Sequence, residues 1–148
     1  DGDVIDAKSL FIVDFIGYET SCWIVKIDSF GEIEWRKCFG DYGYNSEGHY
    51  VIQTNDGGYL LAASISPEVV TNNEEIYKSV WLIKLDKNGK VLWENRYGGS
   101  SFDEPRCLLQ TNDGGYIIGV NARSMDGDIK EPIGSDDIWI FKLEKEKF

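Results

Sequence analysis

Apolar and polar positions alternate over short stretches along most of this chain. Residues 23–27 would place Trp23, Val25 and Ile27 on one face of an extended segment and the two intervening residues on the other. Period-two alternation with aromatic and β-branched residues is typical of a β-strand. Clusters of Gly, Asn, Asp and Ser separate these stretches, as turns would. No stretch has the 3.6-residue period of an amphipathic helix, so the pattern predicts an all-β protein.

Two sequence markers recur with nearly the same period. The heptapeptide Gln-Thr-Asn-Asp-Gly-Gly-Tyr occupies residues 53–59 and again residues 110–116, a spacing of 57. A motif that begins with Trp and ends with an acid occupies residues 23–28, 81–86 and 139–144, with a spacing of 58. Periods of this size are typical of propellers and solenoids.

Each period holds about four short predicted strands. We expect one repeat domain over residues 1–148, with unit one at about 9–57, unit two at about 58–114 and a partial unit at about 115–148. This arrangement predicts a partial β-propeller of about two and a half blades. Propellers typically have four to eight blades. We therefore expect either a homo-oligomer that closes a ring or contacts with further blades of a longer chain.

Residues that occur in both units are interpreted as structural, because a catalytic group is normally needed once. Glu47 and Glu104 are one such pair, and Asp56 and Asp113 are another. We expect the acids to accept backbone N–H bonds in turns and the tryptophans to fill the space between blades. His49, the single histidine of the chain, is interpreted as an ordinary strand-edge residue.

Residues that are not repeated are where a ligand site is expected. The first unit has Asp41, Tyr42, Tyr44 and Asn45 at a place where the second unit has Gly-Ser-Ser-Phe. Aromatic faces beside polar groups can bind sugars, so these four residues are candidate ligand contacts. The alternative is that they only pack the loop.

A second candidate site lies in or beside one of the two long loops predicted at residues 66–79 and 123–136. Four acids there offer oxygen ligands for Ca²⁺, and they are Asp126, Asp128, Asp136 and Asp137. Their spacing matches no known calcium motif, so a solvated acidic loop is the alternative. No other cofactor is expected.

The net charge of −11 limits the classes of partner. A chain this acidic would be repelled by nucleic acid and by anionic lipid, whereas calcium or a basic partner would be compatible. The apolar runs are far shorter than the roughly 20 residues that span a bilayer. We expect neither nucleic-acid binding nor membrane insertion.

The three cysteines cannot all pair within one chain. Cys22 and Cys38 flank a predicted hairpin and could lie opposite each other, which makes a disulfide conceivable. Directly opposed cross-strand bridges tend to be strained. We therefore favour three packed thiols, Cys107 included.

The repeats resemble those of a known family. Residues 81–99 followed by 110–118 are similar to the repeat of secreted bacterial β-propeller-like proteins, of a type common in Bacteroidetes and in some archaea. The resemblance covers about residues 10–144. It implies a β-propeller, an extracytoplasmic location (secreted, periplasmic or surface-anchored) and a binding or scaffold role.

Two functions follow as hypotheses. The first is a non-catalytic secreted or cell-surface module that contacts a protein or carbohydrate ligand through its variable rim loops. The alternative is a fragment of a glycan-active propeller enzyme, which would need a pair of carboxyl groups at a defined separation. The sequence contains no nucleophile-elbow, zinc-protease, P-loop or dinucleotide-binding motif, which favours the binding module.

Overall fold

The computed structural model describes residues 10–14, 21–40, 44–67, 77–131 and 134–145, and for 10–14 only the backbone. Within these ranges the regular structure consists of β-strands, which confirms the all-β prediction, and no helix there is long and apolar enough to cross a membrane. The strands are β1 (Leu10–Asp14), β2 (Cys22–Ile27), β3 (Ile33–Phe39), β4 (Tyr44–Gln53), β5 (Tyr59–Pro67), β6 (Ser79–Leu85), β7 (Val91–Tyr97), β8 (Asp103–Gln110), β9 (Tyr116–Ala122) and β10 (Asp137–Leu143).

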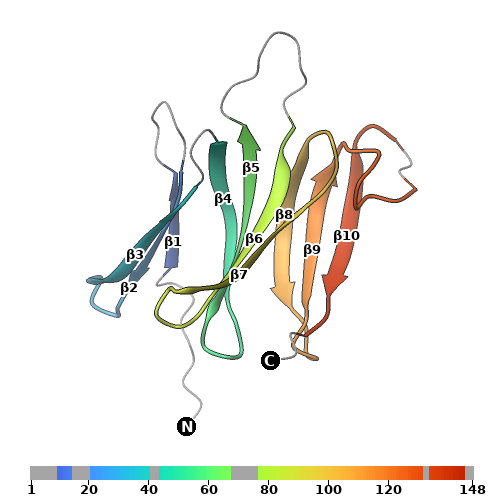
Figure 1. Ribbon diagram of the computed structural model, residues 1–148. Coiled ribbons are helices and arrows are strands. Elements are labelled where there is room, and N and C mark those ends of the chain that lie inside the picture. The colour runs from blue at the N-terminus through green and yellow to red at the C-terminus, as the bar shows by residue number, and fades with distance from the viewer. Residues whose placement is uncertain (1–9, 15–20, 41–43, 68–76, 132–133, 146–148) are drawn as a thin grey trace.

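The described strands form three antiparallel sheets that stand side by side in chain order (Figure 1). The first sheet is β1-β2-β3, the second is β4-β5-β6-β7 and the third is β8-β9-β10. The contact between the second and third sheets runs chiefly between β4 and β8, which are the first strands of their sheets. Each sheet is a meander in which consecutive strands pair.

The sheets and the sequence units divide the chain at different places. The chain passes from one sheet to the next between β3 and β4 and again between β7 and β8, whereas the units change after residue 57 and after residue 114. A tandem repeat can be divided at any phase, so this difference leaves the predicted period open. The sheets hold three, four and three described strands, where the sequence suggested two complete units and a strand pair.

Both faces of the second sheet are buried over β5 and β6. We call the face directed at the preceding sheet the front face, and the face directed at the following sheet the back face. Because successive residues of a strand point to opposite faces, a strand covered on both sides is apolar throughout, as β5 is. The front face packs on Cys22 and Ile24 and consists of Tyr59, Leu61, Ala63, Ile65, Trp81, Ile83 and Leu85. The back face residues Leu60, Ala62, Val80 and Leu82 pack on Ile118, Val120 and Ala122 of the third sheet.

Four of the five tryptophans pack between sheets, as expected: Trp35, Trp81, Trp93 and Trp139. The ring of Trp35 meets Tyr59 of the next sheet edge-on, with 5.6 Å between ring centroids. Its indole N–H is buried and has no hydrogen-bond partner among the described residues.

The repeated heptapeptide forms the turn between β4 and β5, and again the turn between β8 and β9. The Gly57 N–H donates to the Thr54 carbonyl over 2.8 Å, and Gly57 has a positive φ of 80° that glycine adopts without strain. The Asp56 carboxylate accepts the Gly58 N–H at 2.9 Å, and Asp113 accepts the equivalent bond in the second turn. These bonds confirm the expectation for Asp56 and Asp113. The expectation is wrong for Glu47 and Glu104, which lie within β4 and β8 and form ion pairs with Lys78 and Arg106 instead.

Gly58 is required for a different reason than Gly57. A Cβ atom at this position would lie 2.2 Å from the carbonyl oxygen of Leu85 and 2.8 Å from the ammonium of Lys84. The second glycine of the motif therefore lets the turn approach the end of β6.

The idea that Cys22 lies opposite Cys38 is wrong, and the two cysteines do not form a disulfide. Cys38 is paired with Trp23, one residue further along, and neighbouring residues of a strand point to opposite faces. Cys22 is therefore buried on the back face of the first sheet, while Cys38 lies on its front face. None of the three thiols forms a disulfide, but Cys38 and Cys107 are exposed rather than packed.

Candidate functional site

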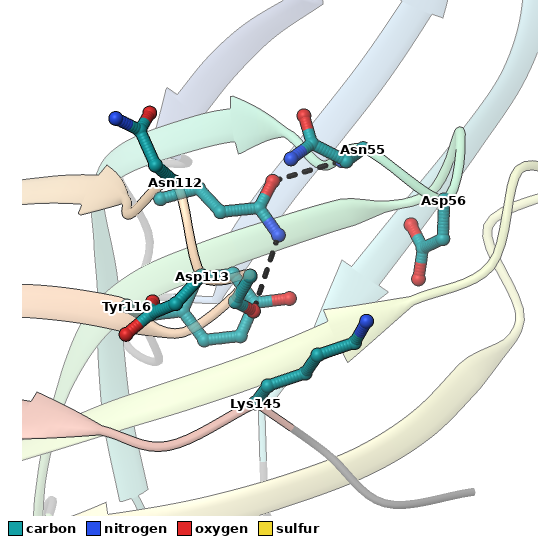
Figure 2. A pocket seen from close by; sticks show the side chains of 8 residues that line it. Asn55, Asp56, Asn112, Asp113, Tyr116 and Lys145 are labelled. Atoms are coloured by element: carbon teal, nitrogen blue, oxygen red, sulfur yellow. Dashed lines mark hydrogen bonds between the residues drawn. The ribbon is translucent and has the colours of Figure 1, made fainter.

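A polar groove lies between the two copies of the repeated turn. It has a volume of about 340 Å³ (Figure 2). The two turns that flank it lie at the end of the sheets opposite to the end where β5 stops and β6 begins (Figure 1). We call it the turn groove. Its lining residues are Asn55, Asp56, Gln110, Asn112, Asp113, Gly114, Tyr116 and Lys145.

Gln110 holds the two turns together. Its side-chain oxygen accepts the backbone N–H of Asn55 at 2.8 Å, and its amide nitrogen donates to the carbonyl of Gly114 at 3.4 Å (Figure 2). The first residue of one heptapeptide thus binds the preceding copy of the turn. This bond fixes the width of the turn groove.

Three polar side chains in the turn groove are not used by the fold. The amides of Asn55 and Asn112 and the ammonium of Lys145 make no hydrogen bond or ion pair within the described part of the chain. Both asparagines are exposed, and Figure 2 shows them on the two turns that flank the groove. Each amide offers two donors and an acceptor to a ligand.

The carboxylate of Asp56 forms an ion pair with Lys84 of β6. Lys84 has no exposed side-chain surface, and its ammonium donates to Asp56 Oδ2 at 2.8 Å. Burial opposes ionisation of Asp56, but the bonds from Lys84, Thr54 and Gly58 outweigh it and lower the pKa of Asp56 to about 2.

Asp113 has the equivalent partners in the second turn. The Lys142 ammonium, the Thr111 hydroxyl and the Gly115 N–H all donate to its carboxylate, and together they lower the pKa of Asp113 below its usual value. Both carboxyl groups of the turn groove are therefore ionised at neutral pH.

An aromatic cavity of about 260 Å³ adjoins the turn groove, and the two share Tyr116. Trp93, Tyr97 and Tyr116 supply its rings, and Asn95, Leu143 and Glu144 complete the lining. Aromatic surface therefore lies next to the free amides of the turn groove.

A charged cluster lies away from the turn groove, on β4 and β8, the first strands of the second and third sheets. Each strand carries a β-bulge at the same repeat position, so His49 on β4 and Arg106 on β8 are the extra residues of the two bulges. A bulge redirects the side chain of the extra residue, and bulges are over-represented next to active sites. His49 lies 2.9 Å from Ser64 Oγ, and burial lowers the pKa of His49.

Within the described ranges, Glu47, His49 and Glu104 are the group of metal-ligating side chains that converges, with ligand atoms within 4.8 Å of one another. The positively charged side chains of Lys78 and Arg106 already neutralise the two glutamates of this group. Lys78 Nζ lies 3.0 Å from Glu47 Oε2 and 3.8 Å from Glu104 Oε1, and Arg106 is 2.6 Å from Glu104. We interpret the cluster as an ion-pair network that joins the second and third sheets.

The predicted ligand contacts are only partly within the described residues. Asp41 and Tyr42 lie outside them. Tyr44 begins β4, and the guanidinium of Arg96 lies 5.3 Å from the centre of its ring. Asn45 follows in the same strand, paired with Ser66 of β5. The two described members therefore belong to a strand rather than to an open loop.

The four predicted calcium ligands each have a protein partner. Within the described part of the chain they do not form a group of three converging ligands. Their partners are the Ser100 N–H for Asp126 (2.7 Å), the Gly98 N–H for Asp128 (3.1 Å), Arg123 Nε for Asp136 (2.9 Å) and the Gly134 N–H for Asp137 (2.9 Å). A calcium site at these residues stays a prediction.

Comparison with known proteins adds no assignment. No protein-family model matches the chain, and no curated protein matches it in sequence.

Proposed function

We propose that this chain is a non-catalytic binding module of β-propeller type that binds a short carbohydrate in the turn groove. The observation that carries the proposal is the set of unused polar groups beside aromatic rings. The amides of Asn55 and Asn112 and the ammonium of Lys145 can hydrogen-bond hydroxyl groups. The rings of Trp93 and Tyr97 offer apolar surface for the C–H face of a sugar.

The combination of surfaces suits a carbohydrate better than an apolar ligand. Ligand sites usually combine apolar lining with a few placed polar groups. Here the polar groups dominate the turn groove, and the rings lie in the adjoining cavity. A sugar presents both kinds of surface on one molecule.

The alternative, a glycan-hydrolysing enzyme, has less support. Such an enzyme needs one carboxyl group with a raised pKa as its acid and a second that stays ionised. The pKa values of Asp56 and Asp113 are both lowered, since each carboxylate accepts bonds from a lysine, a threonine and a glycine. Neither would hold a proton for a leaving group at neutral pH.

The propeller assignment and the extracytoplasmic location belong to the same proposal. Successive antiparallel sheets that pack face to face are compatible with consecutive blades. The location rests on the resemblance of the repeats to those of secreted bacterial propeller-like proteins.

A glycan array followed by calorimetric titration of each hit tests the proposal. We expect Asn112→Ala and Asn55→Ala each to weaken binding at least about tenfold, because each removes a bidentate amide. The matched control is Asn88→Ala, an exposed asparagine in the β6–β7 turn outside the groove, which should leave affinity unchanged. Binding that is insensitive to both groove variants, or no binding to any glycan, would overturn the proposal.

A further inference from the structure

An apolar patch covers the back face of the third sheet. Ile138 and Ile140 of β10 are 83% and 65% exposed, and Leu109 of β8 on the same face is 45% exposed. Ile140 is paired with Gly119 of β9, which is in turn paired with Cys107 of β8. The residues across this part of the face are therefore small or apolar. A contiguous exposed patch of large apolar side chains often marks a surface that contacts a partner.

The repeat indicates what kind of surface covers this patch. Val80 and Leu82 occupy the positions in β6 that Ile138 and Ile140 occupy in β10. Both are completely buried, because the front face of the third sheet packs on them. A surface like that front face would therefore bury the patch in the same way.

The chain itself carries such a surface at its other end. Trp23, Val25 and Ile27 lie on the front face of the first sheet, at the positions that Trp81, Ile83 and Leu85 occupy in the second. The second-sheet residues are buried against the first sheet, whereas the three first-sheet residues are only half-buried. The described array thus ends in two uncovered faces of complementary kinds.

We infer that the back face of the third sheet binds the front face of the first sheet in a second copy of this chain. The contact would repeat the packing that already joins consecutive sheets. Polar residues are not an obstacle, since Lys142 and Asn121 on the back face correspond to Lys84 and Ser64, which are buried in the second sheet.

Such a contact is heterologous, since it joins two different surfaces. It leaves one free face of each kind after the first contact, so assembly continues until a ring closes. Two copies would bring six sheets together, which lies within the four to eight blades of propellers. The inference does not depend on the turn groove, because it uses neither its residues nor a ligand.

The test is the mass of the chain in solution, measured by light scattering and sedimentation over a range of concentrations. We expect the wild-type chain to form a dimer or higher oligomer. Ile140→Lys should abolish assembly by placing a charge in the contact, and Val25→Lys should abolish it from the other side. The same substitution at Leu92, an exposed residue of β7, is the matched control and should assemble normally. Circular dichroism verifies that each variant is folded.

Mixing the two assembly-defective variants provides the decisive observation. The Ile140→Lys chain keeps an intact front face and the Val25→Lys chain an intact back face, so their mixture should form a one-to-one heterodimer. A wild-type chain that stays monomeric at the highest concentration would overturn the inference. So would assembly that survives Ile140→Lys, or a mixture of folded variants that stays monomeric.

Discussion

The ammonium of Lys84 lies 2.8 Å from the carboxylate of Asp56, and the lysine is buried while the aspartate is half-exposed. Lys142 and Asp113 form the same pair one repeat later, but there the lysine side chain is 40% exposed. The third sheet covers the back face that carries Lys84, and no described sheet covers the one that carries Lys142. The same sequence motif is thus placed in two different environments.

Asp56→Ala should lower the free energy of unfolding by about 3 kcal/mol, since it leaves a buried ammonium without its counter-charge. Asp113→Ala should cost much less than Asp56→Ala, because its lysine stays in contact with water. Urea unfolding of both variants measures the difference. In the Asp56→Ala background, replacing Lys84 by Met should recover part of the loss. Equal losses at Asp56 and Asp113 would contradict this prediction.

Acid should destabilise the fold in part through Asp56. Its pKa is about 2 in the folded state against an ordinary value of 3.8, so the unfolded chain binds the proton first as the pH falls. The contribution is complete above about pH 5 and is lost between about pH 4 and pH 2. It should amount to about 1 kcal/mol, after allowance for the exposure of the carboxylate. Unfolding free energies of Asp56→Asn measured against pH should show a shallower slope in this range than the wild type.

His49 should add a second pH dependence near neutrality. Burial lowers its pKa below the ordinary 6.5, so the neutral imidazole is favoured in the fold and the unfolded chain takes up the proton first. Stability should therefore fall as the pH drops from about 7 to 5. His49→Gln keeps a polar group near Ser64 and should flatten the profile. If the two profiles have the same slope over this range, His49 does not cause it.

Gln110→Ala should cost about 1 kcal/mol, because the Asn55 N–H loses its acceptor at the contact between two sheets. Gln53 is the matched control. It stands at the same place in the first copy of the heptapeptide, and its side chain makes no hydrogen bond within the described part of the chain. Gln53→Ala should therefore have an effect close to zero, and thermal unfolding of the two variants compares them.

The sequence was sufficient for the existence of the strands and for the turn role of Asp56 and Asp113, but not for the role of Glu47 and Glu104, which form ion pairs within strands. Period-two alternation identified β2 and β6, and the duplicated Asp-Gly-Gly turns led correctly to carboxylates that accept backbone N–H bonds. It missed the pairing of Cys22 with Phe39, because a β-bulge between Lys26 and Ile27 shifts the register by one residue. Without the bulge, the register that pairs Ile27 with Ile33 would place Cys22 opposite Cys38.

The turn groove was missed for a different reason. Its residues are duplicated, and duplication was interpreted as purely structural. Asp56 and Asp113 do have that role, but Asn55 and Asn112 on the same turns do not use their side chains for the fold. The bulges at His49 and Arg106 were also not predicted. The two residues are 57 positions apart, so the repeat alone indicates that a bulge at one of them would recur at the other.

The bond from Asn55 to Gln110 also determines how many grooves a repeat array can have. Each groove needs two successive turns, because one turn supplies the N–H and the next supplies the glutamine. Grooves therefore belong to the junctions between repeats. An open array with two such turns has a single junction of this kind, and lengthening it by one turn adds one more. The number of ligands that an array can bind in such grooves would therefore equal the number of junctions between repeats. Only in a closed ring would there be as many grooves as turns.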